Sequence, residues 1–298
     1  MKFDEFTACV VDSMKVRMLQ DNEEVVIKTN KVLKNNGVEL TALNLCRSSD
    51  EVCPTIYLEP FYREYMGGKD YDDVIDDVYR LHRRRCGADG VRLEKVMDEN
   101  NVMDNIILRI INRERNEKLL RDAPYVEYKD FAIVFRRVVE LRKDGIATTL
   151  VSNSDMKRWR VSIDTMYKKG LENTERMFPA LRKSLFDVIQ DRYNSFDPDI
   201  GDCTGELYIL TNSYGINGAT AVLYPGMLES CAELVDDDIY VLPSSVHELL
   251  FIGAGAGYTE EYLSDLVREA NLNAVSEMDF LSDNIYLYSR KEGVFRQI

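Results

Sequence analysis

Four side chains of the kinds that catalysis uses lie within one short segment near the C-terminal end of the chain. They are Ser244, Ser245, His247 and Glu248. A serine hydroxyl becomes nucleophilic when a neighbouring imidazole takes its proton, and a carboxylate can orient that imidazole. The segment therefore suggests a hydrolase-like site, with Asn212 from a neighbouring strand as a further candidate.

The predicted geometry of this segment argues against a local catalytic pair. Residues 247–252 are predicted to form a strand, in which successive side chains point to opposite faces of the sheet. His247 then shares one face with Leu249 and Phe251, while Glu248 lies on the other face. Because apolar residues occupy both faces, we expect a central strand covered on two sides, and we interpret His247 and Glu248 as structural residues.

Basic residues form a second group with chemical potential, and they gather in the middle of the chain. Residues 80–183, the basic middle segment, hold 24 Lys and Arg against 16 Asp and Glu, although the whole protein carries a net charge of −14. Two clusters stand out in this segment. Their members are Arg83, Arg84, Arg85, Arg158, Trp159 and Arg160. Such clusters attract carboxylates and phosphates, so both are candidate binding sites.

The flanks of the basic middle segment decide which partner we expect. Residues 184–298 hold 5 basic and 20 acidic side chains, which would repel a phosphate backbone. The leading hypothesis is therefore a non-enzymatic binding or regulatory protein that engages an acidic protein partner. The hydrolase-like enzyme is the first alternative. Nucleic-acid binding, with bases stacked on Trp159 beside its basic neighbours, is the second.

No cofactor or metal is expected from the remaining motifs. Residues 253–257 read Gly-Ala-Gly-Ala-Gly, which differs from the G-x-G-x-x-G spacing of a dinucleotide loop and predicts a surface turn. The acidic side chains at residues 72–77 are interpreted as a solvated helix face. Two histidines cannot build a His-rich metal centre, and the six cysteines include no Cys-x-x-Cys pair. Reduced thiols in a cytoplasmic protein are expected, without a membrane span.

Hydrophobic spacing predicts the elements that must position these groups. Phe6, Val10, Met14 and Met18 recur at helical spacing, and Asn36-Gly37 predicts a hairpin between strands at 25–32 and 38–43. Further helices are expected at 71–81, between 151 and 189, at 227–234 and at 260–269. Strands are expected at 55–58, 131–139, 146–151, 207–210, 239–242 and 284–288, whereas 106–111 fits either a helix or a strand.

These elements predict an α+β protein with mostly antiparallel sheets, helices packed on them, and two units. Strand pairs joined by short turns, with helices between the groups, favour this class over a parallel doubly wound sheet. The expected units are residues 1–121 and 122–298, with a rival boundary in the polar loop at 193–205.

A series of short motifs also resembles a known family. The motifs are residues 35–41, 54–59, 171–174, 210–212, 217–219, 223–228 and 240–248, the last reading Tyr-Val-Leu-Pro-Ser-Ser-Val-His-Glu. In this order they resemble an uncharacterised family of intestinal clostridial proteins, catalogued as a domain of unknown function. Residues 55–81 and 239–252 resemble, more faintly, a second uncharacterised family of Gram-positive bacteria. The resemblance implies a bacterial cytoplasmic origin, and it transfers no catalytic role.

Overall fold

The structure is a computed structural model that describes residues 1–47, 55–85, 99–142, 145–188 and 207–298. It shows helices together with three antiparallel sheets, so the predicted α+β class is confirmed. The chain divides into two compact units. Unit 1 comprises Met1–Lys34 and Val38–Asp98, and unit 2 comprises Asn35–Gly37 and Glu99–Ile298. Apart from the turn at Asn35–Gly37, this division falls between residues 98 and 99, and the boundary at 121 stays a prediction.

Unit 1 packs three helices against one small sheet. Its helices are α1 (Phe3–Gln20), α2 (Glu59–Met66) and α3 (Tyr71–Arg85), and its strands are β1 (Val26–Leu33), β2 (Glu39–Cys46) and β3 (Thr55–Tyr57). The strand order is β1-β2-β3, and both pairings are antiparallel. Phe6, Val10, Met14 and Met18 are buried along one side of α1, which confirms the predicted helix and its apolar face.

The predicted hairpin turn forms at Asn35–Gly37, which is a 3-10 turn. Asn36 has a φ of 59° and Gly37 a φ of 75°, both in the left-handed region that Asn and Gly tolerate. Asn36 is buried and makes two hydrogen bonds with the side chain of Asn116. The backbone N–H of Asn36 donates to Oδ1 of Asn116 at 2.8 Å. Nδ2 of Asn116 donates to the side-chain Oδ1 of Asn36 at 2.9 Å. These contacts explain why the turn belongs to unit 2.

Unit 2 contains two antiparallel sheets. The four-stranded sheet is built from β4 (Ile106–Asn112), β5 (Tyr125–Tyr128), β6 (Phe131–Arg142) and β7 (Gly145–Leu150). The six-stranded sheet is built from β8 (Ala180–Ser184), β9 (Tyr208–Asn212), β10 (Ile239–Ser245), β11 (Glu248–Gly253), β12 (Tyr286–Ser289) and β13 (Val294–Gln297). Its strand order is β13-β12-β10-β11-β9-β8. In the smaller sheet β6 is central and pairs with β4, β5 and β7.

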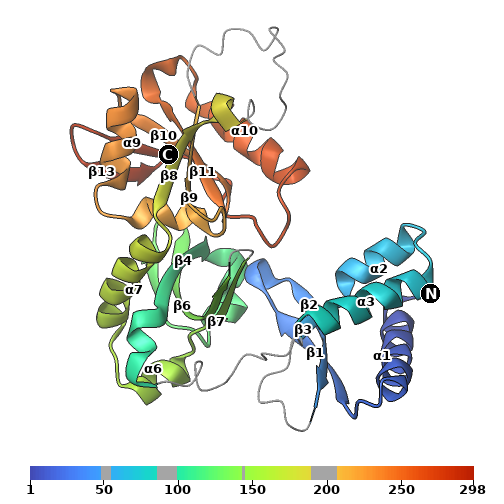
Figure 1. Cartoon of the computed structure of the whole chain (residues 1–298). Helices are drawn as coiled ribbons and strands as arrows, with labels where there is room; N and C mark the ends of the chain where they lie inside the picture. The colour runs from blue at the N-terminus through green and yellow to red at the C-terminus, as the bar shows by residue number, and fades with distance from the viewer. Residues whose placement is uncertain (48–54, 86–98, 143–144, 189–206) are drawn as a thin grey trace. The chain divides into compact units, whose positions relative to one another are not determined.

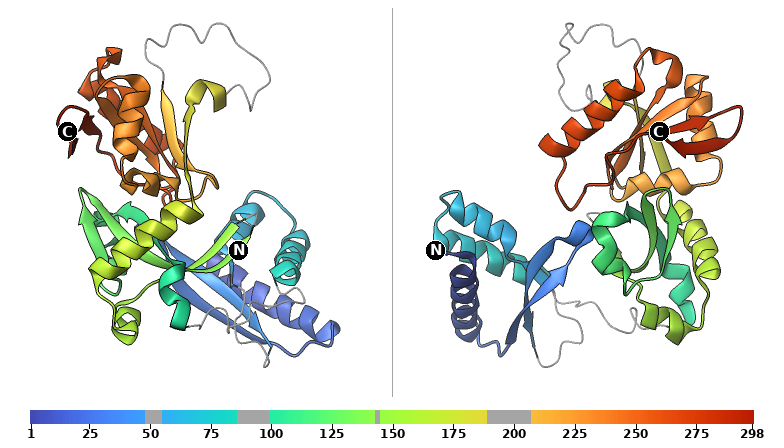
Figure 2. Two further views of the ribbon diagram at one scale, coloured as in Figure 1. Left: turned by 60° about the vertical axis from the view of Figure 1, so that its left-hand side comes forward. Right: turned by 180° about the vertical axis from the view of Figure 1, so that it is seen from behind.

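Helices and short turns cover these sheets. The helices of unit 2 are α5 (Glu117–Leu120), α6 (Asn153–Trp159), α7 (Ile163–Met177), α9 (Met227–Val235) and α10 (Glu260–Asn273). The 3-10 segments are η2 (Glu99–Asn105), η3 (Glu114–Asn116), η4 (Gly218–Leu223) and η5 (Ala254–Ala256). Figures 1 and 2 show α7 beside β4 and β6. A Cβ at Gly170 of α7 would lie 2.8 Å from Cδ2 of Leu108, so this glycine lets the helix approach β4 closely.

The six-stranded sheet is buried on both faces, as the apolar alternation of β11 predicts. Leu249 and Phe251 belong to the large core that includes Cys231 and Ala232 of α9. Ile252 faces the opposite way, into a cluster with Leu263 and Val267 of α10. Figure 1 accordingly shows α9 and α10 on different sides of β10 and β11. The central strands of this sheet are therefore covered by apolar residues on both faces.

The structure corrects several sequence-based expectations. Residues 106–111 form a strand, and 180–184 form a strand where a helix was expected. The strands β5 and β13 were not expected, and residues 218–223 form a 3-10 helix. Cys46 takes part in a disulfide and Cys9 is exposed, although reduced and mostly buried thiols were expected. The polar loop predicted at 193–205 lies outside the described residues. Among described helices, none has the length and apolarity to cross a membrane.

Candidate functional site

The first predicted basic cluster lies at the C-terminal end of α3 in unit 1. Arg83 forms an ion pair with Glu23, and its guanidinium carbon lies 5.8 Å from the ring centre of Tyr79. Hydrogen bonds from Arg47 and Arg83 hold the pKa of the Glu23 carboxyl below its ordinary value. Arg84 is exposed, and Arg85 is described only as part of the helix backbone. The charge of Arg83 is therefore already matched inside the protein.

The second predicted basic cluster lies at the end of α6 in unit 2. Arg158 pairs with Asp155 at 3.2 Å, and its guanidinium carbon lies 5.9 Å from the ring centre of Trp159. Trp159 is partly buried against the core, and its Nε1 has no acceptor among the described residues. Arg160 is exposed in a left-handed conformation with a φ of 54°. Packing against the core limits the ring surface that a nucleic-acid base would need for stacking.

The four candidate catalytic residues surround the turn between β10 and β11. Ser244 Oγ donates to Glu248 Oε1 at 3.4 Å, and Ser245 Oγ accepts the backbone N–H of His247 at 3.0 Å. His247 lies in the turn rather than on the strand, which corrects the prediction that it shares a face with Leu249 and Phe251. Both serine hydroxyls are thus engaged away from the imidazole in this conformation. Asn212 holds its own loop, since Nδ2 donates to the Ile216 carbonyl at 2.8 Å.

The imidazole of His247 has partners on both nitrogens. Nδ1 accepts the backbone N–H of Asn217 at 3.2 Å, and Nε2 lies 3.2 Å from Asp279 Oδ1. An Nδ1 that accepts must be unprotonated, so the neutral ring donates through Nε2 to Asp279. Asp279 Oδ2 accepts the hydroxyl of Ser276 at 2.7 Å. The pair positions this turn, and it leaves no nitrogen available to take a proton from a serine.

One face of the four-stranded sheet carries arginines in an apolar setting, and we call it the arginine face. It comprises Ile107, Arg109 and Ile111 of β4, Ala132, Val134 and Arg136 of β6, Tyr125 and Glu127 of β5, and Leu150 of β7. These residues are directly opposite one another across the strands, so their side chains share a face. The other face of the same sheet packs into the large core through residues such as Leu108 and Phe135.

Arg109 stands out on this face because its side chain has no partner among the described residues. Its Nε is buried without an acceptor, while the side chain as a whole is partly buried. Burial lowers the pKa of Arg109 to about 10, and the positive charge of Arg136 contributes less to this decrease. The Asp279 carboxylate acts in the opposite direction and raises the pKa. Arg136 itself donates through Nε to Oγ1 of Thr148 at 2.7 Å. The guanidinium of Arg109 is therefore a partly desolvated cation that makes no ion pair with the described residues.

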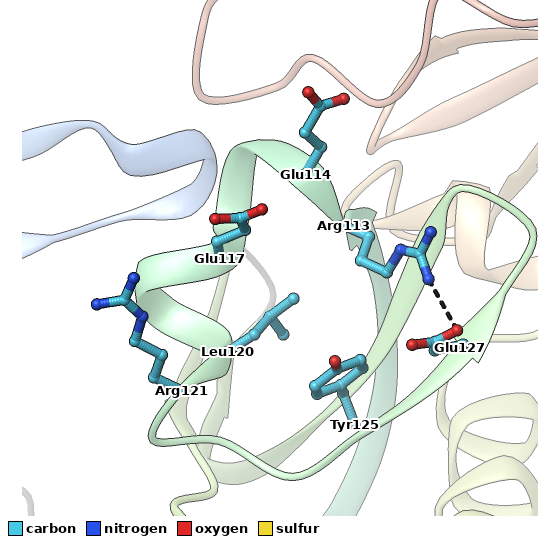
Figure 3. Close-up of a pocket in the computed structure, with 7 residues that line it drawn as sticks. All are labelled: Arg113, Glu114, Glu117, Leu120, Arg121, Tyr125 and Glu127. Carbon is cyan, nitrogen blue, oxygen red and sulfur yellow. Dashed lines mark ion pairs between the residues drawn. The ribbon is translucent and has the colours of Figure 1, made fainter.

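A hollow of about 620 Å³ lies at the end of the arginine face (Figure 3). It is lined by Arg113, Glu114, Glu117, Leu120, Arg121, Tyr125 and Glu127. Arg113 points toward Glu127 and pairs with it at 2.7 Å, whereas Arg121 projects on the opposite side of α5. With both signs of charge on its walls, the hollow does not itself select an anion. It adjoins the edge of the arginine face, since Tyr125 and Glu127 belong to both.

The sequence analysis placed Arg109 in the basic middle segment but did not select it as a site residue. Its signal is one charged residue in the run Ile106-Ile107-Leu108-Arg109-Ile110-Ile111. A single arginine in a buried strand needs a counter-charge or a special environment. Asp279 was missed altogether, because nothing in its local sequence connects it with a histidine 32 positions earlier. Among the described residues, no group of three or more His, Cys, Asp or Glu is placed to hold a metal ion.

The fold and the site define an α+β protein of two units whose distinguishing chemical feature is an unpaired arginine on a sheet face. The family model described as "Family of unknown function (DUF5688)" matches residues 3–290, so the chain belongs to that family. This confirms the resemblance to a domain of unknown function. No curated protein matches the chain, and no solved structure matches it.

Proposed function

We propose that this protein is a non-enzymatic binding protein that engages an acidic protein partner through the arginine face of unit 2. The observation that carries the proposal is the partnerless guanidinium of Arg109, whose Nε is buried without an acceptor. A protein that keeps a desolvated cation without a counter-ion gives up stability, and such departures concentrate at functional sites. An incoming carboxylate would supply the missing charge and hydrogen-bond acceptor.

The comparison with the two predicted clusters supports this choice of surface. Arg83 and Arg158 already pair with Glu23 and Asp155, so a partner would have to displace an internal carboxylate. Arg109 needs no such exchange. The clusters remain predictions, and Arg84 is the exposed cation through which the first of them can be tested.

The alternatives receive less support from the geometry. A hydrolase needs a hydroxyl within reach of the imidazole, and the hydroxyls of Ser244 and Ser245 are engaged with Glu248 and with the His247 backbone. Nucleic-acid binding through Trp159 needs an accessible ring, and that ring packs against the core. Both stay predictions that rank below acidic-partner binding.

A glutamate peptide tests the proposal directly. We expect a fluorescently labelled peptide of about ten glutamates to bind the full-length protein, with an affinity that falls severalfold between about 50 mM and about 200 mM NaCl because salt screens the contact. The net charge of −14 repels such a peptide in general, so binding would report a local cationic site. Fluorescence anisotropy is the measurement.

The matched control is a glutamine peptide of the same length, which we expect not to bind. An Arg84→Gln variant tests the first predicted cluster in the same assay, and we expect its affinity for the glutamate peptide to equal that of the wild type. If the glutamate peptide shows no salt-dependent binding to the wild-type protein, the proposed function is wrong.

A further inference from the structure

We infer that Arg109 binds a single carboxylate group. This inference rests on the proposed function. The position of Arg109, the charges around it and the shape of the guanidinium support this assignment. Each points to one planar monoanion rather than to an extended anionic surface.

The position of Arg109 limits the size of the ligand group. Its side chain stands on β4 between Ile107 and Ile111, and directly opposite Val134 of β6. Those three neighbours are buried, at 5%, 3% and 1% exposure. Apolar neighbours packed this closely exclude a bulky group, and they exclude the water that would otherwise weaken a contact with the guanidinium.

The charges acting on Arg109 favour a monoanion. The cation of Arg136 and the carboxylate of Asp279 act on it with opposite signs. Asp279 acts on Arg109 only through its charge, because no hydrogen bond or ion pair joins the two side chains among the described residues. Arg109 and Arg136 are two cations acting beside the one carboxylate of Asp279, so one positive charge of this group of three stays unmatched. A carboxylate would neutralise it, whereas a phosphate dianion would bring a second negative charge close to Asp279.

The shape of the guanidinium supports the same group. Its planar fork of N–H donors matches the two oxygens of a carboxylate, and such charge-assisted pairs are the strong hydrogen bonds of proteins. The buried Nε–H of Arg109 is a donor without an acceptor. A carboxylate would accept from it and from one terminal nitrogen of the same side chain.

The Nε–H resonance of Arg109 is the direct test, read by ¹⁵N NMR on the full chain and assigned by its loss in an Arg109→Met variant. The probes are N-acetylglutamate N′-methylamide for a side-chain carboxylate, N-acetylglycine for a chain-terminal carboxylate, and inorganic phosphate. We expect the resonance to shift on titration with at least one carboxylate. The dissociation constant of that carboxylate should be lower than that of phosphate. The carboxylate that binds with the higher affinity shows whether the site takes a side-chain or a chain-terminal carboxylate. Phosphate binding as tight as the better carboxylate, or no shift with any probe, overturns the inference.

The stability of Arg109→Met without ligand gives a second readout. The pKa of Arg109 is lowered in the folded state, which means that the charged form is disfavoured there. Removing that charge should leave the Tm at or above the wild-type value. The matched control is Lys291→Met, an exposed cation in a turn. A Tm clearly below that of the control would show that Arg109 is held by internal contacts, which contradicts the inference.

The two proposals fail separately. If the glutamate peptide binds but the Arg109 resonance does not respond to carboxylates, the inference is wrong and the proposed function stands. If a small carboxylate shifts the Arg109 resonance but the glutamate peptide does not bind, the carboxylate site stands and the acidic protein partner is wrong.

Discussion

Replacing Gly218 with alanine is expected to lower the free energy of unfolding by about 3 kcal/mol, the cost of forcing an atom into a closed backbone site. Gly218 begins η4 and is buried. A Cβ on it would lie 2.5 Å from the His247 carbonyl oxygen and 2.7 Å from the Asn212 nitrogen, and it would also meet the Thr211 hydroxyl. Two of these three atoms are backbone, so the clash is relieved only by moving β9 or the β10–β11 turn.

Gly170→Ala is the matched control for this prediction. Its added Cβ would meet Cδ2 of Leu108 at 2.8 Å, which is the end of a flexible side chain. Alanine also has a helix propensity about 1 kcal/mol better than that of glycine, which offsets part of the clash. Chemical denaturation of both variants is the measurement. Equal losses for Gly218→Ala and Gly170→Ala would contradict the close backbone approach at η4.

The Asp130→Ala variant is expected to lower the free energy of unfolding by about 3 kcal/mol, because the Asp130 carboxylate accepts hydrogen bonds from several side chains. Asp130 Oδ2 accepts from Ser282 Oγ at 2.6 Å and from Asn284 Nδ2 at 3.0 Å, and Oδ1 accepts the hydroxyl of Tyr286. Tyr286 is fully buried, and burial followed by the Asp130 charge raises the pKa of its hydroxyl. Without Asp130, the partner that this hydroxyl keeps among the described residues is Ser282 Oγ, at 3.3 Å.

Asp283→Ala provides the comparison, because this neighbouring carboxylate is exposed and accepts one amide, Nδ2 of Asn271, at 2.8 Å. We expect it to cost less than about 1 kcal/mol. The Tyr286→Phe change should reduce the effect of Asp130→Ala in the double variant, since the two residues share one hydrogen bond. Denaturant titration of the wild type, the three single variants and the double variant is the measurement. Additive losses would show that Asp130 and Tyr286 act independently.

Elements with strong local patterns could be predicted from the sequence, and elements that depend on distant partners could not. The spacing of Phe6 and Val10 defines α1, and Asn36-Gly37 defines a turn, because both signals are local. By contrast, β8 is a short strand with exposed Arg182 and Lys183, and it exists because β9 pairs with it. Short strands are stabilised mainly by their cross-strand neighbours, which a single sequence does not show.

The candidate site shows the same division. Charge counting singled out the basic middle segment, which contains Arg109, and binding through that segment stays a prediction. Whether an arginine is already paired depends on residues far away in the chain, as Glu23 is for Arg83. The register of β4 against β6 decides that Arg109 stands opposite Val134 rather than opposite a carboxylate. The sequence therefore indicates which segment is rich in cations, and the fold determines which of those cations are already paired.

The affinity of the glutamate peptide for Arg109→Met, measured beside that for Lys291→Met by anisotropy at low salt, tests the central claim most directly. Both variants remove one positive charge, but only Arg109 is a buried donor without an acceptor. We predict a loss of about tenfold or more for Arg109→Met, the worth of one charge-assisted hydrogen bond, and less than about twofold for Lys291→Met. Equal affinities of the two variants for the peptide would contradict the assignment of binding to the arginine face.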